Sequence, residues 1–155
     1  MTDAETRVLP ADAGSVSNLP DFKKKTRLYC KNGGYHLVLL PDGTVGGVRD
    51  EGKYTVLRVK SVTRGVVVIQ GDVTERYLAM SDEGKLHSSL TVTDECHFLE
   101  KMEENHYNTY QSQKYSESSW YVALKKNGKP KLGPRTHIGQ KAIFFLPRRL
   151  ENSGK

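Results

Sequence analysis

A repeat of about 40 residues constrains the fold of this 155-residue chain more than any other feature. Three stretches, YHLVLLPDG, RYLAMSDEG and WYVALKKNG, each place an apolar-x-apolar pair shortly before a turn glycine. The glycines are spaced 41 and 44 residues apart: Gly43, Gly84 and Gly128. Further upstream, three more residues recur 41 positions apart each time: Leu28, Ile69 and Tyr110. Downstream of the turns, apolar segments recur at residues 57–59, 98–100 and 144–146.

Repeats of this length indicate either an array of blades or a closed three-fold β structure. A blade propeller needs about four blades or more, whereas this chain holds three repeats. No segment keeps a helical periodicity, and turn signals separate short alternating segments, which is typical of an all-β barrel. We therefore predict an all-β fold, a β-trefoil of three repeats of four short strands with pseudo-three-fold symmetry.

The repeat also predicts the core and the extent of the domain. Periodic apolar residues usually pack inside, so the expected core is Leu28, Leu37, Leu39, Ile69, Leu78, Met80, Phe98, Tyr110, Val122, Leu124 and Phe144. We place the trefoil at residues 22–150, between a polar, flexible N-terminal tail at 1–21 and a short C-terminal tail at 151–155.

Positive charge is concentrated in the third repeat. From Ser118 to Leu150 there are eight Lys or Arg and no Asp or Glu, so this run sums to +8 while the whole chain is +6 and the remainder −2. The corresponding turns of the first two repeats are acidic or mixed. A solvated lysine-rich loop is the simplest interpretation, but surfaces without a specific partner normally intersperse both signs of charge. We therefore expect an anionic partner for this segment.

The chemistry of the segment favours one class of anion. Single-stranded nucleic acid is usually held by aromatic residues interleaved with cations, and residues 124–142 contain no aromatic residue. The glycine spacing in GKPKLGPR resembles a phosphate-binding loop, but PR stands where lysine and a hydroxyl residue are required. Lysines, one arginine and neutral polar side chains suit a flexible polymer of sulfates and carboxylates. A sulfated glycosaminoglycan fits best.

Nothing in the sequence indicates an enzyme, a metal site or a membrane protein. The five histidines lack the spacing of metal ligands, and no nucleophile motif occurs. Glu103 and Glu104 could pair for acid–base chemistry, but they lie in a charged segment that is more typical of a solvated face. Cys30 and Cys96 are expected to be free, buried thiols, although a disulfide would also be compatible with two cysteines. No apolar run approaches the roughly 20 residues that span a bilayer.

Several motifs resemble the acidic/basic branch of the fibroblast growth factor family, and the acidic type most closely. They are LPDGTVGGVRD, RYLAM, DEC, EENHYNTY and GPRTHIGQKAIFFLP, in order from about Leu28 to Pro147. The resemblance implies a β-trefoil that binds heparan sulfate as its only co-ligand and activates a cell-surface receptor tyrosine kinase. It implies a mitogen that promotes proliferation, angiogenesis and differentiation. The protein would be a monomer that dimerises on heparan sulfate together with its receptor.

Matching motifs carry two sets of site residues onto this chain. The heparin-binding set is Asn32, Lys125, Lys126, Asn127, Lys131, Arg135, Thr136, Gln140 and Lys141. The receptor-binding set is Tyr29, Arg49, Glu100, Tyr107, Asn108 and Leu146. Leu132 stands where the acidic type is often basic, and Arg148 where the family usually has an apolar contact residue.

A basic stretch at residues 22–27, FKKKTR, resembles the family's nuclear-import sequence through Lys23, Lys24, Lys25 and Arg27. Such a stretch is more often solvated or an auxiliary polyanion contact, so these alternatives stay open. Residues 1–20 lack the features of a signal peptide. We therefore expect non-classical export to the outside of the cell, with cytoplasmic and nuclear pools.

The rival hypothesis is an intracellular trefoil that binds nucleic acid or other polyanions without a receptor. It predicts that Tyr107→Ala and Asn108→Ala leave activity intact, whereas the growth-factor hypothesis predicts lost signalling with heparin affinity kept.

Overall fold

The structure is a computed structural model that describes residues 25–150. The predicted tails at 1–21 and 151–155, as well as Lys23 and Lys24 of the basic stretch, lie outside the described residues.

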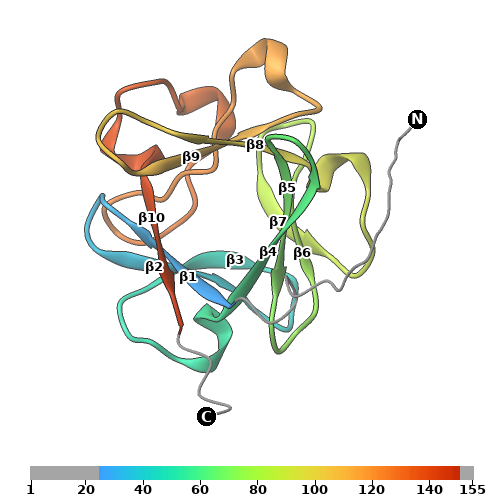
Figure 1. Cartoon of the computed structure of the whole chain (residues 1–155), viewed down its shortest axis with the longest axis vertical. Helices are drawn as coiled ribbons and strands as arrows, with labels where there is room; N and C mark the ends of the chain where they lie inside the picture. Colours follow the sequence, from blue (N-terminus) through green and yellow to red (C-terminus); the bar gives the residue numbers. More distant parts are fainter. Residues whose placement is uncertain (1–24, 151–155) are drawn as a thin grey trace.

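Six antiparallel strands close into a barrel (Figure 1). They are β1 (Thr26–Cys30), β4 (Leu57–Thr63), β5 (Val66–Gly71), β8 (Phe98–Met102), β9 (Asn108–Ser112) and β10 (Phe145–Arg149). Pairing runs from β1 through β4, β5, β8, β9 and β10 and returns to β1. The ring therefore leaves no barrel strand with an unpaired edge.

Three hairpin-like segments are attached to this barrel, one in each repeat. β2 (Tyr35–Leu39) pairs with β3 (Val45–Val48), and β6 (Tyr77–Met80) pairs with β7 (Leu86–Ser89). The third repeat keeps only two isolated bridges, Gln111 to Tyr121 and Leu124 to Pro130. The β-trefoil is thus confirmed, but residues 25–150 form ten strands rather than the twelve expected.

The turn glycines join the three repeats to one another. The carbonyl of Gly43 accepts a hydrogen bond from the Ser88 amide (3.1 Å), and that of Gly84 accepts one from Gly133 (2.8 Å). The carbonyl of Gly128 closes the cycle by accepting from the Gly47 amide at 2.8 Å. Each repeat therefore holds the next, which explains why the glycines recur at the period of the fold.

Short 3-10 helices repeat the same symmetry. η2 (Lys53–Thr55), η3 (Asp94–Cys96) and η6 (Lys141–Ile143) lie just before β4, β8 and β10. The third repeat adds η4 (Ser116–Ser118) and η5 (Gly133–Arg135). The helices within residues 25–150 are all single turns of this kind, so none of them could span a bilayer.

The core contains the predicted apolar residues, with one correction. All eleven are buried, but Phe144 packs in a small separate cluster with Ala123, Ala142 and Ile143. The position equivalent to Leu57 and Phe98 in the main core belongs to Phe145. The sequence pattern predicted Phe144 instead of Phe145 for this position because both phenylalanines are apolar. Adjacent residues of an extended chain point to opposite faces, so only one of the two can enter the main core. Cys30 and Cys96 are buried and free, as predicted.

Candidate functional site

Seven residues of the first and third repeats line a hollow of about 650 Å³, which we call the cationic hollow. They are Asn32, Lys125, Lys126, Pro130, Lys131, Leu132 and Arg135. Five of the nine predicted heparin-binding residues therefore come together here: Asn32, Lys125, Lys126, Lys131 and Arg135.

Backbone hydrogen bonds of the third repeat shape the rim of the hollow. The Lys125 amide donates to the carbonyl of Lys129, and the Gly128 amide donates to Lys125, both at 2.8 Å. Asn127 stabilises the same turn, because its Oδ1 accepts from the Lys129 amide at 3.0 Å. Asn32 ties the first repeat to this loop by donating from Nδ2 to the Leu124 carbonyl at 3.1 Å.

The positive charge of the hollow is not offset by ion pairs within the described part of the chain. Within residues 25–150 none of its lysines, nor Arg135, forms a salt bridge. Lys125, Lys126 and Arg135 are exposed. Unscreened positive charge around a concave surface attracts anions. Leu132 adds an apolar contribution to the same wall, being 45% exposed.

The other predicted heparin-binding residues lie outside the hollow, and the polar side chains of two of them form hydrogen bonds within the protein. The buried Thr136 hydroxyl donates to the Gly133 carbonyl (2.6 Å) and accepts from the Tyr121 amide (3.0 Å). Gln140 donates to the Arg135 carbonyl and accepts from the His137 amide, so it bridges its own loop. Lys141 is exposed at the start of η6.

The predicted receptor residues fall into three groups, which lie on the strand pair β1 and β10, at an edge, and at the mouth of the barrel. Tyr29 and Leu146 lie opposite one another on β1 and β10. At the edge, the Arg49 guanidinium lies 4.6 Å from the centre of the Tyr35 ring. Tyr107 is half-buried, with its ring 6.4 Å from that of Phe144 and the Lys31 ammonium 5.2 Å from its centre.

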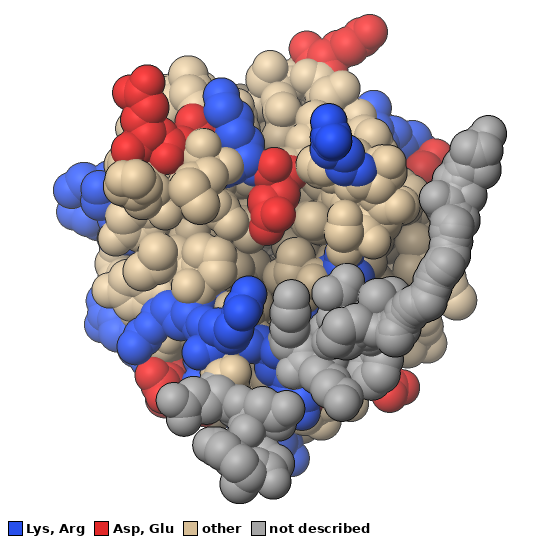
Figure 2. All heavy atoms as spheres, in the orientation of Figure 1, with Lys and Arg blue, Asp and Glu red and all other residues tan. Residues whose placement is uncertain are grey.

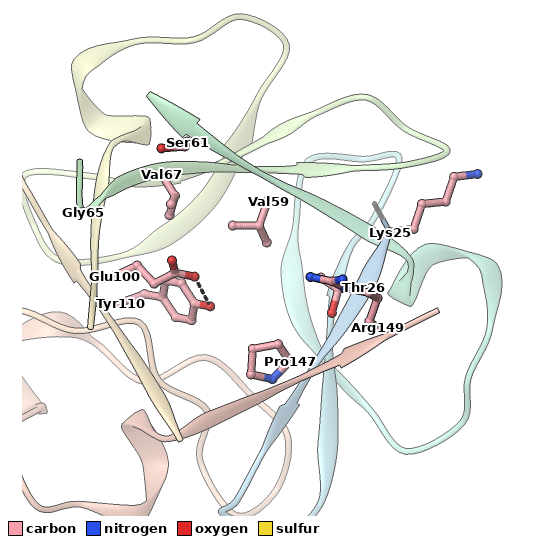
Figure 3. A pocket seen from close by; sticks show the side chains of 10 residues that line it. All are labelled: Lys25, Thr26, Val59, Ser61, Gly65, Val67, Glu100, Tyr110, Pro147 and Arg149. Carbon is pink, nitrogen blue, oxygen red and sulfur yellow. Dashed lines mark hydrogen bonds between the residues drawn. The ribbon is translucent and has the colours of Figure 1, made fainter. Parts of the chain in front are cut away.

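Glu100 lies at the mouth of the barrel, in a pocket of about 430 Å³ (Figure 3). Its Oε2 accepts a hydrogen bond from the Tyr110 hydroxyl at 2.8 Å and a longer one from Asn108 Nδ2 at 3.4 Å. Burial is the main cause that raises the pKa of Tyr110 far above its usual range, and the negative charge of Glu100 is the second cause. The phenol therefore stays protonated and donates. Asn108 is only 8% exposed, and its amide therefore serves this network more than the outer surface.

Sequence reasoning missed part of this pocket. Lys25 and Arg149 also line it, and Tyr110 was predicted as a core residue only. The repeat indicates which side chains point inward, but it says nothing about the polar atom that an inward side chain carries.

The basic stretch ends inside the barrel, in β1. Arg27 belongs to β1, where its Nε donates to Thr55 Oγ1 at 2.8 Å. Lys25 forms an ion pair with Asp72 at 3.5 Å. Strand pairing therefore holds Arg27 within the barrel, and a role of the basic stretch in nuclear import stays a prediction.

Residues 25–150 contain no group of three or more His, Cys, Asp or Glu that could hold a metal ion.

The model of one protein family, described as fibroblast growth factor, matches residues 24–146. The chain belongs to the fibroblast growth factor family. It is 64% identical to a Danio rerio protein provisionally named fibroblast growth factor 1, over 91% of this chain and 95% of that protein. It is 55% identical to fibroblast growth factor 2 of Ovis aries and of Bos taurus, over 90% of both chains in each comparison. A fibroblast growth factor is a secreted signalling protein rather than an enzyme; this chain is a growth factor that acts on fibroblast growth factor receptors.

Proposed function

We propose that the cationic hollow is the heparan sulfate site of this growth factor. The observation that carries the proposal is the convergence of Asn32 with four cations, none of them in an ion pair within residues 25–150, around one concave surface. Arg135 can grip a sulfate with paired donors, and the lysines supply adaptable point charges. Thr136 and Gln140 contribute by fixing the loop, and Lys141 extends the positive surface along a bound chain. Heparan sulfate is then the only co-ligand.

We also propose that the receptor binds across Tyr29 and Leu146, with Tyr107, Arg49 and the Glu100 pocket around them. Half-buried tyrosines flanked by polar groups are typical of interface hot spots. A monomeric ligand that holds heparan sulfate at the hollow and the receptor at this second surface can bring two receptors together. Cytoplasmic and nuclear pools stay predictions. The structure gives the nuclear pool little support, because Lys25 forms an ion pair with Asp72 and Arg27 donates a hydrogen bond to Thr55.

Salt-dependent binding to a heparin oligosaccharide and to single-stranded DNA of similar charge tests the first proposal. The variant Lys126→Gln/Lys131→Gln removes two cations from the hollow. The control Lys85→Gln/Lys129→Gln removes two exposed cations that do not line it. We expect tighter binding to heparin than to DNA, with a larger loss in the hollow variant than in the control. Equal losses of heparin affinity in both variants would mean that the hollow is only a non-specific polyanion patch.

Receptor activation in cells separates the two surfaces. Tyr107→Ala should abolish signalling while retention on heparin is kept. Tyr107 is a better probe than Asn108, because Asn108→Ala would also disturb the buried bonds to Glu100 and Tyr110. Signalling that survives Tyr107→Ala would contradict the proposed receptor surface.

A further inference from the structure

Two arginines face each other across the pairing of β1 and β10. Arg27 lies directly opposite Arg148, and Arg149 follows opposite Thr26. Like charges directly opposite one another destabilise a sheet unless something neutralises them. We call Arg27, Arg148 and Arg149 the arginine cluster. Figure 2 shows a band of Lys and Arg side chains across the lower part of the face, over the region where β10 ends in Figure 1.

The acidic compensation for this cluster is incomplete. Glu51 lies 3.9 Å from both Arg27 and Arg148, which are long contacts for ion pairs. Arg149 forms no side-chain hydrogen bond or ion pair with the residues of the described range, 25–150. The cluster and Glu51, together with Leu150, border a hollow of about 320 Å³. Three guanidinium groups against one carboxylate leave a local excess of positive charge.

Arg148 is held in place although half of its side chain is exposed. Its Nη1 lies 3.4 Å from His36 Nε2, and its guanidinium lies 5.7 Å from the centre of the Tyr29 ring. An arginine can only donate, so His36 Nε2 accepts and its Nδ1 donates to the Asp50 carbonyl at 3.1 Å. These contacts orient a cation beside Tyr29 before any partner arrives.

Two features decide what the arginine cluster binds. It is continuous with Tyr29 and Leu146 of the proposed receptor surface, through the strand pair β1 and β10. The exposed Glu51 borders it, and this carboxylate would repel a polysulfated chain. A protein surface with discrete acidic residues can instead place carboxylates on the arginines and keep clear of Glu51.

We propose that the arginine cluster extends the receptor-binding surface and takes Asp or Glu side chains of the receptor ectodomain. This inference rests on the proposed receptor surface. Guanidinium groups pair with carboxylates through two parallel hydrogen bonds, which gives direction as well as affinity. Arg148 and Arg149 therefore select a receptor with acidic residues opposite the end of β10.

The test measures binding of the full chain to a panel of immobilised fibroblast growth factor receptor ectodomains at several salt concentrations. The variants are Arg149→Gln, Arg148→Gln/Arg149→Gln and the control Lys85→Gln/Lys114→Gln, each also measured for heparin retention and thermal unfolding. We expect about a tenfold or larger loss of receptor affinity in the double variant, with a weaker salt dependence and unchanged heparin retention. Arg149→Gln should show part of this loss with no change in thermal unfolding, since the Arg149 side chain has no hydrogen-bond or ion-pair partner among residues 25–150.

Each outcome bears on the proposal separately from the receptor function. If the wild type binds a receptor and the double variant binds it as well as the control does, the arginine cluster is not part of the interface. If heparin retention falls in step with receptor affinity, the cluster is a polysaccharide contact and the inference is wrong. If the wild type binds no receptor ectodomain, the proposed receptor surface itself fails first.

Discussion

The buried hydroxyl of Tyr110 connects the core of the barrel to a predicted receptor residue. Because it donates to Glu100 at 2.8 Å, Tyr110→Phe leaves that carboxylate without its shortest partner. We expect a loss of about 1–3 kcal/mol in the free energy of unfolding at neutral pH. The folded pKa of Tyr110 lies above the ordinary value of 10.0, so the wild-type advantage is fully present below pH 10 and declines as the pH rises further.

Chemical denaturation of both proteins from pH 7 to pH 11 checks this sign. The gap between wild type and Tyr110→Phe should narrow above pH 10. Tyr54→Phe is the matched control, because the Tyr54 hydroxyl has no hydrogen-bond partner within residues 25–150 and its loss should leave the alkaline slope of the wild type intact. A constant gap across this range would show that the Tyr110 hydroxyl is not held as described.

At the scale of elements, the third hairpin departs most from the symmetry. Spacing alone predicted its turn glycine and its apolar pair, and both lie where expected. The loss of regular strand pairing was not predicted, although Pro130 and Pro134 gave a signal. Proline has no amide hydrogen for a strand ladder, so this cationic segment is held by single bridges and turns.

Gly128 makes this hairpin testable. Its φ is +85°, and a Cβ there would lie 2.8 Å from the Tyr35 ring and 3.1 Å from the Gly47 carbonyl oxygen. Gly65 is the matched control, with φ +78° and open space around a Cβ. Gly65→Ala should cost about 1–2 kcal/mol from backbone strain alone, and Gly128→Ala about 1–3 kcal/mol more from the clash.

Urea unfolding of the two variants gives both values. Equal losses of unfolding free energy in the two variants would mean that the third hairpin shifts to accommodate the added methyl group. The contacts of Gly128 with Tyr35 and Gly47 would then not hold the repeats together.

Across the whole molecule, the location of the cationic hollow could be predicted better than its shape. The acid-free run selected the third repeat from charge alone, because like charges gather where an anion compensates for them. Charge could not indicate Asn32, which lies more than 90 positions from Leu124 in the chain and contacts it only through the folded structure. Nor could it separate Lys126, which lines the hollow, from Lys129, which does not.

The same uneven charge makes stability depend on the anion. Without heparin, Lys126→Gln/Lys131→Gln should be as stable as the wild type or slightly more stable, because two repelling cations are gone. With heparin at about 100 times its dissociation constant, native-state binding adds about 2.7 kcal/mol to the wild type. The variant should gain clearly less, so that the order of thermal unfolding temperatures reverses when heparin is added.

Lys85→Gln/Lys114→Gln controls for net charge, because it carries the same formal charge as the hollow variant and keeps the hollow intact. Thermal unfolding at low salt, with and without a heparin oligosaccharide, compares the three proteins. A reversal confined to the hollow variant means that the shape of the cationic hollow determines the linkage. If both variants lost the same share of the heparin effect, net charge would explain the stabilisation and the concave arrangement of Asn32 and its lysines would be incidental to it.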